Sequence, residues 1–242
     1  MSTQKAYFLT SALLLHLTYP TTAQADVTCD TEWEGDARDG SLSTAVAKTV
    51  AGDPGREVVV RAVASYFYYR TFEQGFESAV TSPGGSLEIG YRGRMGAVSF
   101  MASTGFEVRR DRWDDDEFVT TDWTSGPLFA AEVSTAYDET DFNLAASYTF
   151  AGAYSWVRGG LEHPVLDLNE MTKAGLVLGW DVTAQGSEGH RSVDLGWILG
   201  LDLPAREASL RLRGGASHQS LGADHAKWSG FLGAQLSLGA RH

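Results

Sequence analysis

Large apolar side chains occupy every second position over most of the last third of the chain, from Lys173 to Ala240. Successive side chains of a β-strand point to opposite faces, so this spacing predicts strands with one apolar face and one polar or small face. Strands of about ten residues that are apolar outside and polar inside are typical of a transmembrane β-barrel. The four strands predicted here have apolar series over Ala174–Val182, Val193–Leu203, Leu210–Ala216 and Trp228–Leu238.

The same alternation continues, less regularly, through the earlier part of the chain. Val58–Arg70 is a strong candidate strand, in which apolar and aromatic side chains alternate with Arg61 and Ser65. Tyr154–Glu162 is also expected to be a strand, but its pattern does not decide which side chains face inward. The remaining candidates are Cys29–Arg38 and Leu42–Ala51, both weak, and Ser86–Arg92, Val98–Arg109, Phe129–Tyr137 and Phe142–Phe150.

The lengths of the connections give a second indication. Outer-membrane barrels have short periplasmic turns and longer outer loops. Counted back from a periplasmic C-terminus, the two longest connections, Thr71–Gly85 and Asp111–Pro127, fall on the outside. Assigning the connections alternately to the inner and outer side requires a further strand before Leu42. We therefore predict an all-β, antiparallel, up-and-down transmembrane β-barrel of twelve strands, with ten as the alternative. The expected inner connections are Gly52–Arg56, Arg94–Gly96, Asp138–Thr140, His163–Thr172 and Leu203–Arg206, of which only His163–Thr172 is long.

The N-terminal residues indicate how such a chain reaches a membrane. Lys5 precedes an apolar run from Ala6 to Leu17, and Ala23-Gln24-Ala25 offers a small-residue cleavage site. This order is typical of a secretory signal peptide. We therefore expect residues 1–25 to be a cleaved signal peptide and residues 26–242 to form one outer-membrane barrel in a Gram-negative cell.

Charge and cysteine content exclude several classes of function. Without residues 1–25 the chain keeps 18 of its 19 lysines and arginines and all 31 acids, so its net charge is 18 − 31 = −13. This acidity argues against a nucleic-acid partner, which selects clustered basic residues. Cys29 is the single cysteine, so neither an intramolecular disulfide nor a thiolate metal cluster is expected.

The polar faces of the predicted strands carry charges of both signs. Charged groups inside a narrow barrel must pair, so one interpretation is an interior filled by ion pairs. The other is a polar track for a saccharide chain, with aromatic rings near the opening. The candidate lumen-facing residues are Arg61, Glu88, Arg92, Glu107, Arg109, Glu132, Asp181, Asp194, Asp202, Arg211 and Arg213.

No catalytic, metal or cofactor site is predicted. Asp114–Glu117 is acidic but lacks the spaced ligands and glycine of a calcium loop, which favours a solvated loop. Ser217 and His218 could suggest Ser-His chemistry, yet adjacent residues on a strand point to opposite faces.

One stretch resembles a known family. Gly179–Arg191, followed by Leu195-Gly196, is similar to the strand–loop–strand signature of the BcsS family, alphaproteobacterial outer-membrane proteins of cellulose biosynthesis. Weaker similarity covers most of the mature chain, including Gly126–Tyr154 and Trp156–Arg158. The chain differs from the family pattern at Trp180-Asp181, where proline-glutamate is expected, and at its C-terminus, which lacks an aromatic residue.

The resemblance implies a function that the residues alone do not supply. It implies a monomeric, non-enzymatic accessory protein of cellulose (β-glucan) biosynthesis or export. Its partners would be outer-membrane lipid, the glucan chain and components of the cellulose synthase complex. The alternatives are a small porin or surface-contact barrel and, third, a barrel-embedded lipid-modifying enzyme.

Overall fold

The computed structural model describes residues 27–36, 39–53, 55–73, 76–114, 119–169, 174–187, 190–221 and 226–239. The predicted signal peptide lies outside these residues. The strands are β1 (Val27–Gly35), β2 (Gly40–Asp53), β3 (Arg56–Glu73), β4 (Phe76–Met95), β5 (Val98–Asp114), β6 (Val119–Tyr137), β7 (Thr140–Thr149), β8 (Tyr154–Asn169), β9 (Ala174–Ser187), β10 (His190–Leu203), β11 (Ala208–Leu221) and β12 (Ala226–Leu238).

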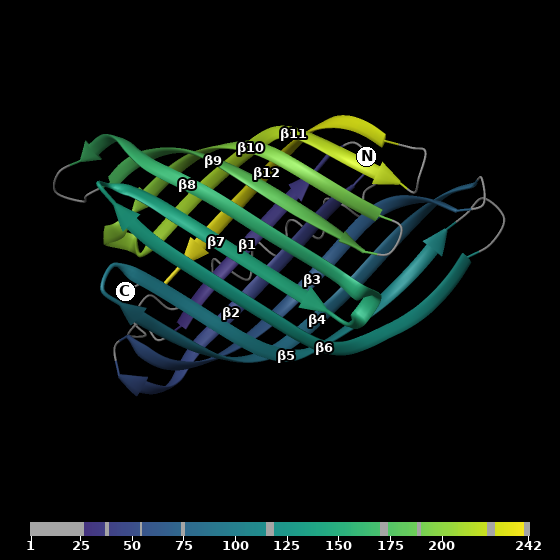
Figure 1. Cartoon of the computed structure of the whole chain (residues 1–242), viewed down its shortest axis with the longest axis horizontal. Coiled ribbons are helices and arrows are strands. Elements are labelled where there is room, and N and C mark those ends of the chain that lie inside the picture. The colour runs from purple at the N-terminus through teal and green to yellow at the C-terminus, as the bar shows by residue number, and fades with distance from the viewer. Residues whose placement is uncertain are drawn as a thin grey trace.

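The twelve strands form one closed antiparallel barrel (Figure 1). Each strand pairs with its neighbours in sequence, and β1 closes the sheet against β12 in a register that runs from Cys29 opposite Leu238 to Gly35 opposite Leu232. The up-and-down barrel of twelve strands is therefore confirmed, and the ten-stranded alternative was wrong. The first strand ends at Gly35, earlier than predicted.

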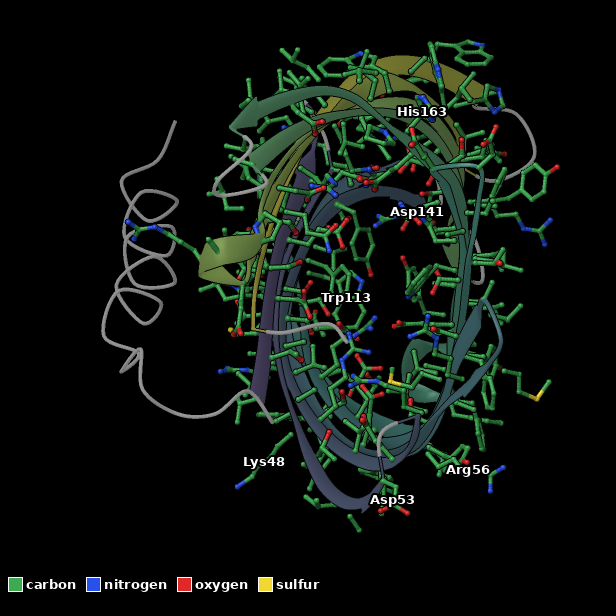
Figure 2. All side chains as sticks on the ribbon, turned by 90° about the vertical axis from the view of Figure 1, so that its left-hand side faces the viewer. Lys48, Asp53, Arg56, Trp113, Asp141 and His163 are labelled. Carbon is green, nitrogen blue, oxygen red and sulfur yellow. The ribbon has the colours of Figure 1, made fainter. Side chains whose placement is uncertain are left out.

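Apolar and polar residues that alternate along the sequence lie on the outer and inner faces of the barrel, respectively. In β10, the outward residues Val193, Leu195, Trp197 and Leu199 are 39–55% exposed, whereas the inward residues Asp194 and Ile198 are 4% and 5% exposed. Figure 2 looks along the barrel and shows polar side chains inside the wall, with Lys48 outside it. The exposed apolar residues of the outer face form a belt around the barrel. An outward-facing apolar belt is typical of barrels whose outer face contacts the hydrocarbon of a membrane.

Three predicted loops were wrong, because the strands continue through most of them. β3 and β4 extend to Glu73 and Phe76, so Thr71–Gly85 is mainly a hairpin. Asp111–Pro127 and His163–Thr172 are likewise mostly strand. Backbone hydrogen bonds between strands do not require apolar side chains. Where the apolar alternation stops, the strand therefore leaves the hydrocarbon region of the membrane but does not end.

The barrel has two unequal ends. Strands β3 to β6 have 17 to 20 residues and the others 9 to 16. The extra length projects at the end that carries the connections after the odd-numbered strands, which we name the tall mouth (Figure 1). The turn mouth is the opposite end, with the connections after the even-numbered strands and Asp53 and Arg56 at its edge (Figure 2).

Helical structure is limited to two single 3-10 turns, Ala151–Ala153 and Pro204–Arg206, within the part of the chain that the structure describes. None of its helices is long and apolar enough to cross a membrane.

Candidate functional site

Two arginines and three acids meet in the lumen and form what we name the central cluster: Glu32, Glu34, Arg158, Asp181 and Arg213. Arg158 Nη1 lies 2.6 Å from Glu32 Oε1, and its Nη2 lies 3.7 Å from Glu34 Oε2. Arg213 Nη1 lies 3.3 Å from the same Glu32 oxygen and also pairs with Glu34 and Asp181. Because β1 and β8 are not neighbours in the sheet, the Arg158–Glu32 pair bridges the lumen.

Two members of the central cluster, Arg213 and Asp181, are buried, and the Asp181 carboxylate is incompletely satisfied. Arg213 and Asp181 are each 3% exposed. Asp181 is within ion-pair distance of both Arg213 and Arg158, yet neither of its carboxylate oxygens accepts a hydrogen bond of good geometry from any residue that the structure describes. Charged groups in such a site depend on one another, since removing one partner leaves the other buried and uncompensated.

A glycine on β10 makes room for this cluster. A Cβ atom at Gly196 would lie 2.6 Å from Asp181 Oδ1 and 2.9 Å from Phe231 Cζ. Any larger residue there would displace one of these side chains. The glycines that alternate with apolar residues in β10 therefore have a packing role inside the barrel.

Two smaller ion-pair groups lie on other parts of the wall. Arg61 Nη1 is 4.0 Å from Glu88 Oε2 and 3.8 Å from Glu132 Oε1, and Ser103 donates a 2.8 Å hydrogen bond to Glu88. Arg92 Nη1 lies 3.3 Å from Glu57 Oε2. These pairs line the half of the barrel formed by β3 to β6.

Arg211 forms a third group toward the turn mouth. Its Nε lies 2.7 Å from Glu162 Oε2, and its Nη1 lies 2.6 Å from Asp202 Oδ1. A Cβ atom at Gly200 would lie 2.7 Å from Arg211 Cδ, so this glycine leaves space for the arginine.

Arg109 combines an ion pair with aromatic contacts. Its Nη2 lies 2.8 Å from Glu107 Oε1, and its guanidinium carbon lies 4.8 Å from the Phe67 ring centroid and 5.7 Å from that of Tyr154. The Tyr154 hydroxyl donates a 2.6 Å hydrogen bond to Gln185 Oε1. Cation–π contacts of this kind hold both rings in place at the lumen wall.

A polar pocket lies inside the barrel at the tall mouth, and we name it the mouth pocket. It is open to solvent, and its walls come from both sides of the barrel. The lining residues are Glu34, Gly35, Asp36, Asp39, Gly40, Ser41, Phe67, Tyr68, Tyr69, Tyr154, Gln185, Ser192, Asp194, Ser217, Gln219 and Phe231.

The structure places the predicted lumen-facing charges on the inner face. It joins them in separate groups: Arg61 with Glu88 and Glu132, Arg109 with Glu107, Arg211 with Asp202, Arg213 with Asp181, and Arg92 with Glu57, while Asp194 lines the mouth pocket. Their binding of a ligand stays a prediction.

Sequence reasoning missed Glu32, Glu34, Glu57, Arg158 and Glu162, which complete these groups. The first two lie on a strand that was only weakly indicated. Arg158 and Glu162 lie on β8, where inward Trp156 is as apolar as outward Val157, so hydrophobicity did not distinguish the faces. A charge on every second position, as at Glu32 and Glu34, was the available signal.

The candidates for enzymatic or metal chemistry do not assemble into a site. Ser217 is buried in the lumen, whereas the His218 ring lies 4.7 Å from the exposed ring of Trp228 on the outside. Within the described ranges no group of three or more histidine, cysteine or acidic side chains could hold a metal ion. Most of Asp114–Glu117 lies outside those ranges.

Comparison with known proteins finds relatives by structure alone. No protein-family model matches the chain, and no curated protein matches it. The β domain of the Bordetella autotransporter Brka is 13% identical, with a TM-score of 0.53 over 90% of this chain and 100% of that one. The translocator domain of autotransporter NalP from Neisseria meningitidis is 12% identical, with a TM-score of 0.54 over 96% and 93%. The KdgM porin is 10% identical, with a TM-score of 0.47 over 88% and 99%.

Sequence identities this low establish a similar fold but no shared function. The chain therefore has the closed β-barrel fold of Gram-negative outer-membrane proteins.

Proposed function

We propose that this chain is a monomeric, non-enzymatic outer-membrane barrel that supports the production or export of a β-glucan such as cellulose. The apolar belt supports contact with outer-membrane lipid, and the fold is that of outer-membrane proteins. The choice of a β-glucan comes from the resemblance of Gly179–Arg191 to the BcsS family. The glucan and components of a cellulose synthase complex are the proposed partners.

The observation that carries the proposal is where that resembling stretch lies in the barrel. Along β9, Asp181 enters the central cluster, Thr183 accepts a 3.1 Å hydrogen bond from Arg158 Nε, and Gln185 lines the mouth pocket. The segment that resembles the family thus supplies consecutive inward side chains to the interior.

Deletion of the gene tests the proposal directly. We expect extracellular cellulose, measured as glucose released by cellulase, to fall strongly, and we expect the wild-type gene to restore it. A matched control is complementation with Val193→Ala, which changes only the outer surface and should restore cellulose fully. Unchanged cellulose together with altered uptake of small solutes would overturn the proposal in favour of a small porin.

The porin alternative has its own supporting observation, which is a closed barrel with a polar interior. The central cluster opposes it, because the Arg158–Glu32 pair crosses the lumen. We expect the wild-type protein to show little conductance in a planar lipid bilayer and Arg158→Ala/Arg213→Ala to conduct several-fold more. Large, steady conductance of the wild type would favour the porin.

A further inference from the structure

We propose that the mouth pocket is a binding site for a neutral saccharide, held by acid, amide and hydroxyl groups on one side and aromatic rings on another. The proposal deepens the function proposed above, on which it rests only for the choice of a β-1,4-linked glucan as the preferred ligand.

The mouth pocket is open to solvent at the tall mouth, so a ligand longer than the pocket can extend out of the barrel. The inner end of the pocket adjoins the central cluster, because Glu34 belongs to both and the Phe231 ring lies 5.7 Å from the guanidinium carbon of Arg213. A ligand that enters from the tall mouth therefore meets the cluster.

A buried hydroxyl in the pocket wall lacks a partner. Ser192 is 4% exposed, lines the pocket, and its Oγ makes no hydrogen bond with any described residue. Leaving a buried polar group unsatisfied costs about 1–3 kcal/mol, so such groups in native proteins usually have an explanation. A ligand hydroxyl placed in the pocket would supply the missing partner.

The charge of the lining selects among possible ligands. The lining includes four acidic residues and no lysine, arginine or histidine among the described residues: Glu34, Asp36, Asp39 and Asp194. The nearby Arg109 and Arg213 are engaged by Glu107 and by the central cluster. An acidic saccharide would be repelled, whereas uncharged hydroxyl groups can donate to these carboxylates.

Aromatic rings supply the apolar half of the site. Phe67 and Tyr154 have ring centroids 6.0 Å apart at an interplanar angle of 54°, and Arg109 lies beside both. The Tyr154 hydroxyl is held by Gln185, so the ring is fixed before a ligand arrives. Rings together with a few placed polar groups suit a ligand that has hydroxyl edges and apolar C–H faces.

The test is calorimetric titration of the purified, detergent-folded protein with cellotetraose, with maltotetraose, tetragalacturonate and calcium chloride as comparison ligands. We expect cellotetraose to bind at least as tightly as maltotetraose and tetragalacturonate to bind at least tenfold more weakly. Phe67→Ala should weaken binding roughly tenfold through loss of an aromatic contact. Ser192→Ala should weaken it about 2- to 12-fold, as expected for one neutral hydrogen bond.

The control is Val193→Ala, one residue along the same strand but on the outer face, which should leave the affinity unchanged. Heat-modifiable migration on a gel verifies that each variant is folded, and Ser192→Ala, which removes one atom, decides the matter where Phe67→Ala does not fold. The proposal is overturned by absence of binding to both neutral tetrasaccharides, by equal binding of tetragalacturonate, by heat from calcium alone, or by equal effects of the Ser192 and Val193 substitutions.

The two proposals fail separately. Loss of cellulose on gene deletion without any saccharide binding would overturn the site and leave the proposed function standing. Saccharide binding that Ser192→Ala weakens, in a strain whose cellulose does not depend on the gene, would support the site and overturn the function.

Discussion

Replacing Arg213 by methionine should lower the free energy of unfolding of the barrel, and the ion pairs of Arg213 indicate by how much. Methionine retains much of the length of the side chain but removes the guanidinium that Glu34 and Asp181 share. Both Arg213 and Asp181 are almost completely buried, so water cannot replace the lost partner without entering the lumen wall.

The expected loss follows from the remaining contacts. Removing one partner of a buried ion pair costs about 3–5 kcal/mol. Arg158 remains 3.7 Å from Glu34 and 4.0 Å from Asp181 and compensates part of the lost interaction. We therefore expect a decrease of about 3 kcal/mol in the free energy of unfolding, at the lower end of that range.

The assay is reversible urea unfolding of the barrel in lipid vesicles, followed by tryptophan fluorescence. The matched control is Arg92→Met, because Arg92 pairs with Glu57 at 3.3 Å in a partly exposed position. Pairs exposed to solvent are worth about 0–1 kcal/mol, so this variant should differ little from the wild type.

A second substitution tests the cause of the effect. Asp181→Asn in the Arg213→Met background removes a charge that the first change left without its main partner, so the double variant should be more stable than Arg213→Met alone. The reasoning is refuted if Arg213→Met costs no more than Arg92→Met, which would mean that the lumen is hydrated enough to solvate a carboxylate at Asp181.

Two further predictions concern the wall. Leu195→Arg places a charge on the outer face near the middle of β10 and should cost about 2–4 kcal/mol in the same unfolding assay, whereas Met95→Arg at the turn mouth should cost about 0–1 kcal/mol. Equal costs would contradict the assignment of the apolar belt to hydrocarbon. Gly215→Ala would place a Cβ atom 2.0 Å from the Leu195 backbone oxygen and should cost about 1–3 kcal/mol, whereas Gly230→Ala meets only ordinary contacts and should be nearly neutral. Similar melting of both glycine variants would contradict this close approach.

The sequence predicted those parts of the barrel in which one strand face is plainly apolar and the other plainly polar. Glu88 and Glu107 were placed in the lumen because exposed apolar residues flank them on the same strands. Side-chain alternation is a local property of extended backbone, so a single segment suffices to reveal it.

Features that depend on several strands together could not be predicted in this way. The hairpin extensions beyond Arg70 and Asp111 are held by backbone pairing, which leaves little mark on side-chain type. The mouth pocket and the central cluster depend on the registers that bring β1 opposite β8 and β11. Arg158 and Glu32 are 126 residues apart, and no local pattern specifies that they meet.

The seam between β1 and β12 has a consequence for how the molecule can open. Glu32 and Glu34 sit on the closing strand, and their partners are arginines from β8 and β11. Unzipping this seam would therefore break a row of backbone hydrogen bonds and, if β1 moves away, would separate Glu32 and Glu34 from two guanidinium groups, leaving these with Asp181 alone. We expect the first strand to be among the last to leave the assembled wall, so opening of the barrel toward the bilayer between β1 and β12 is disfavoured.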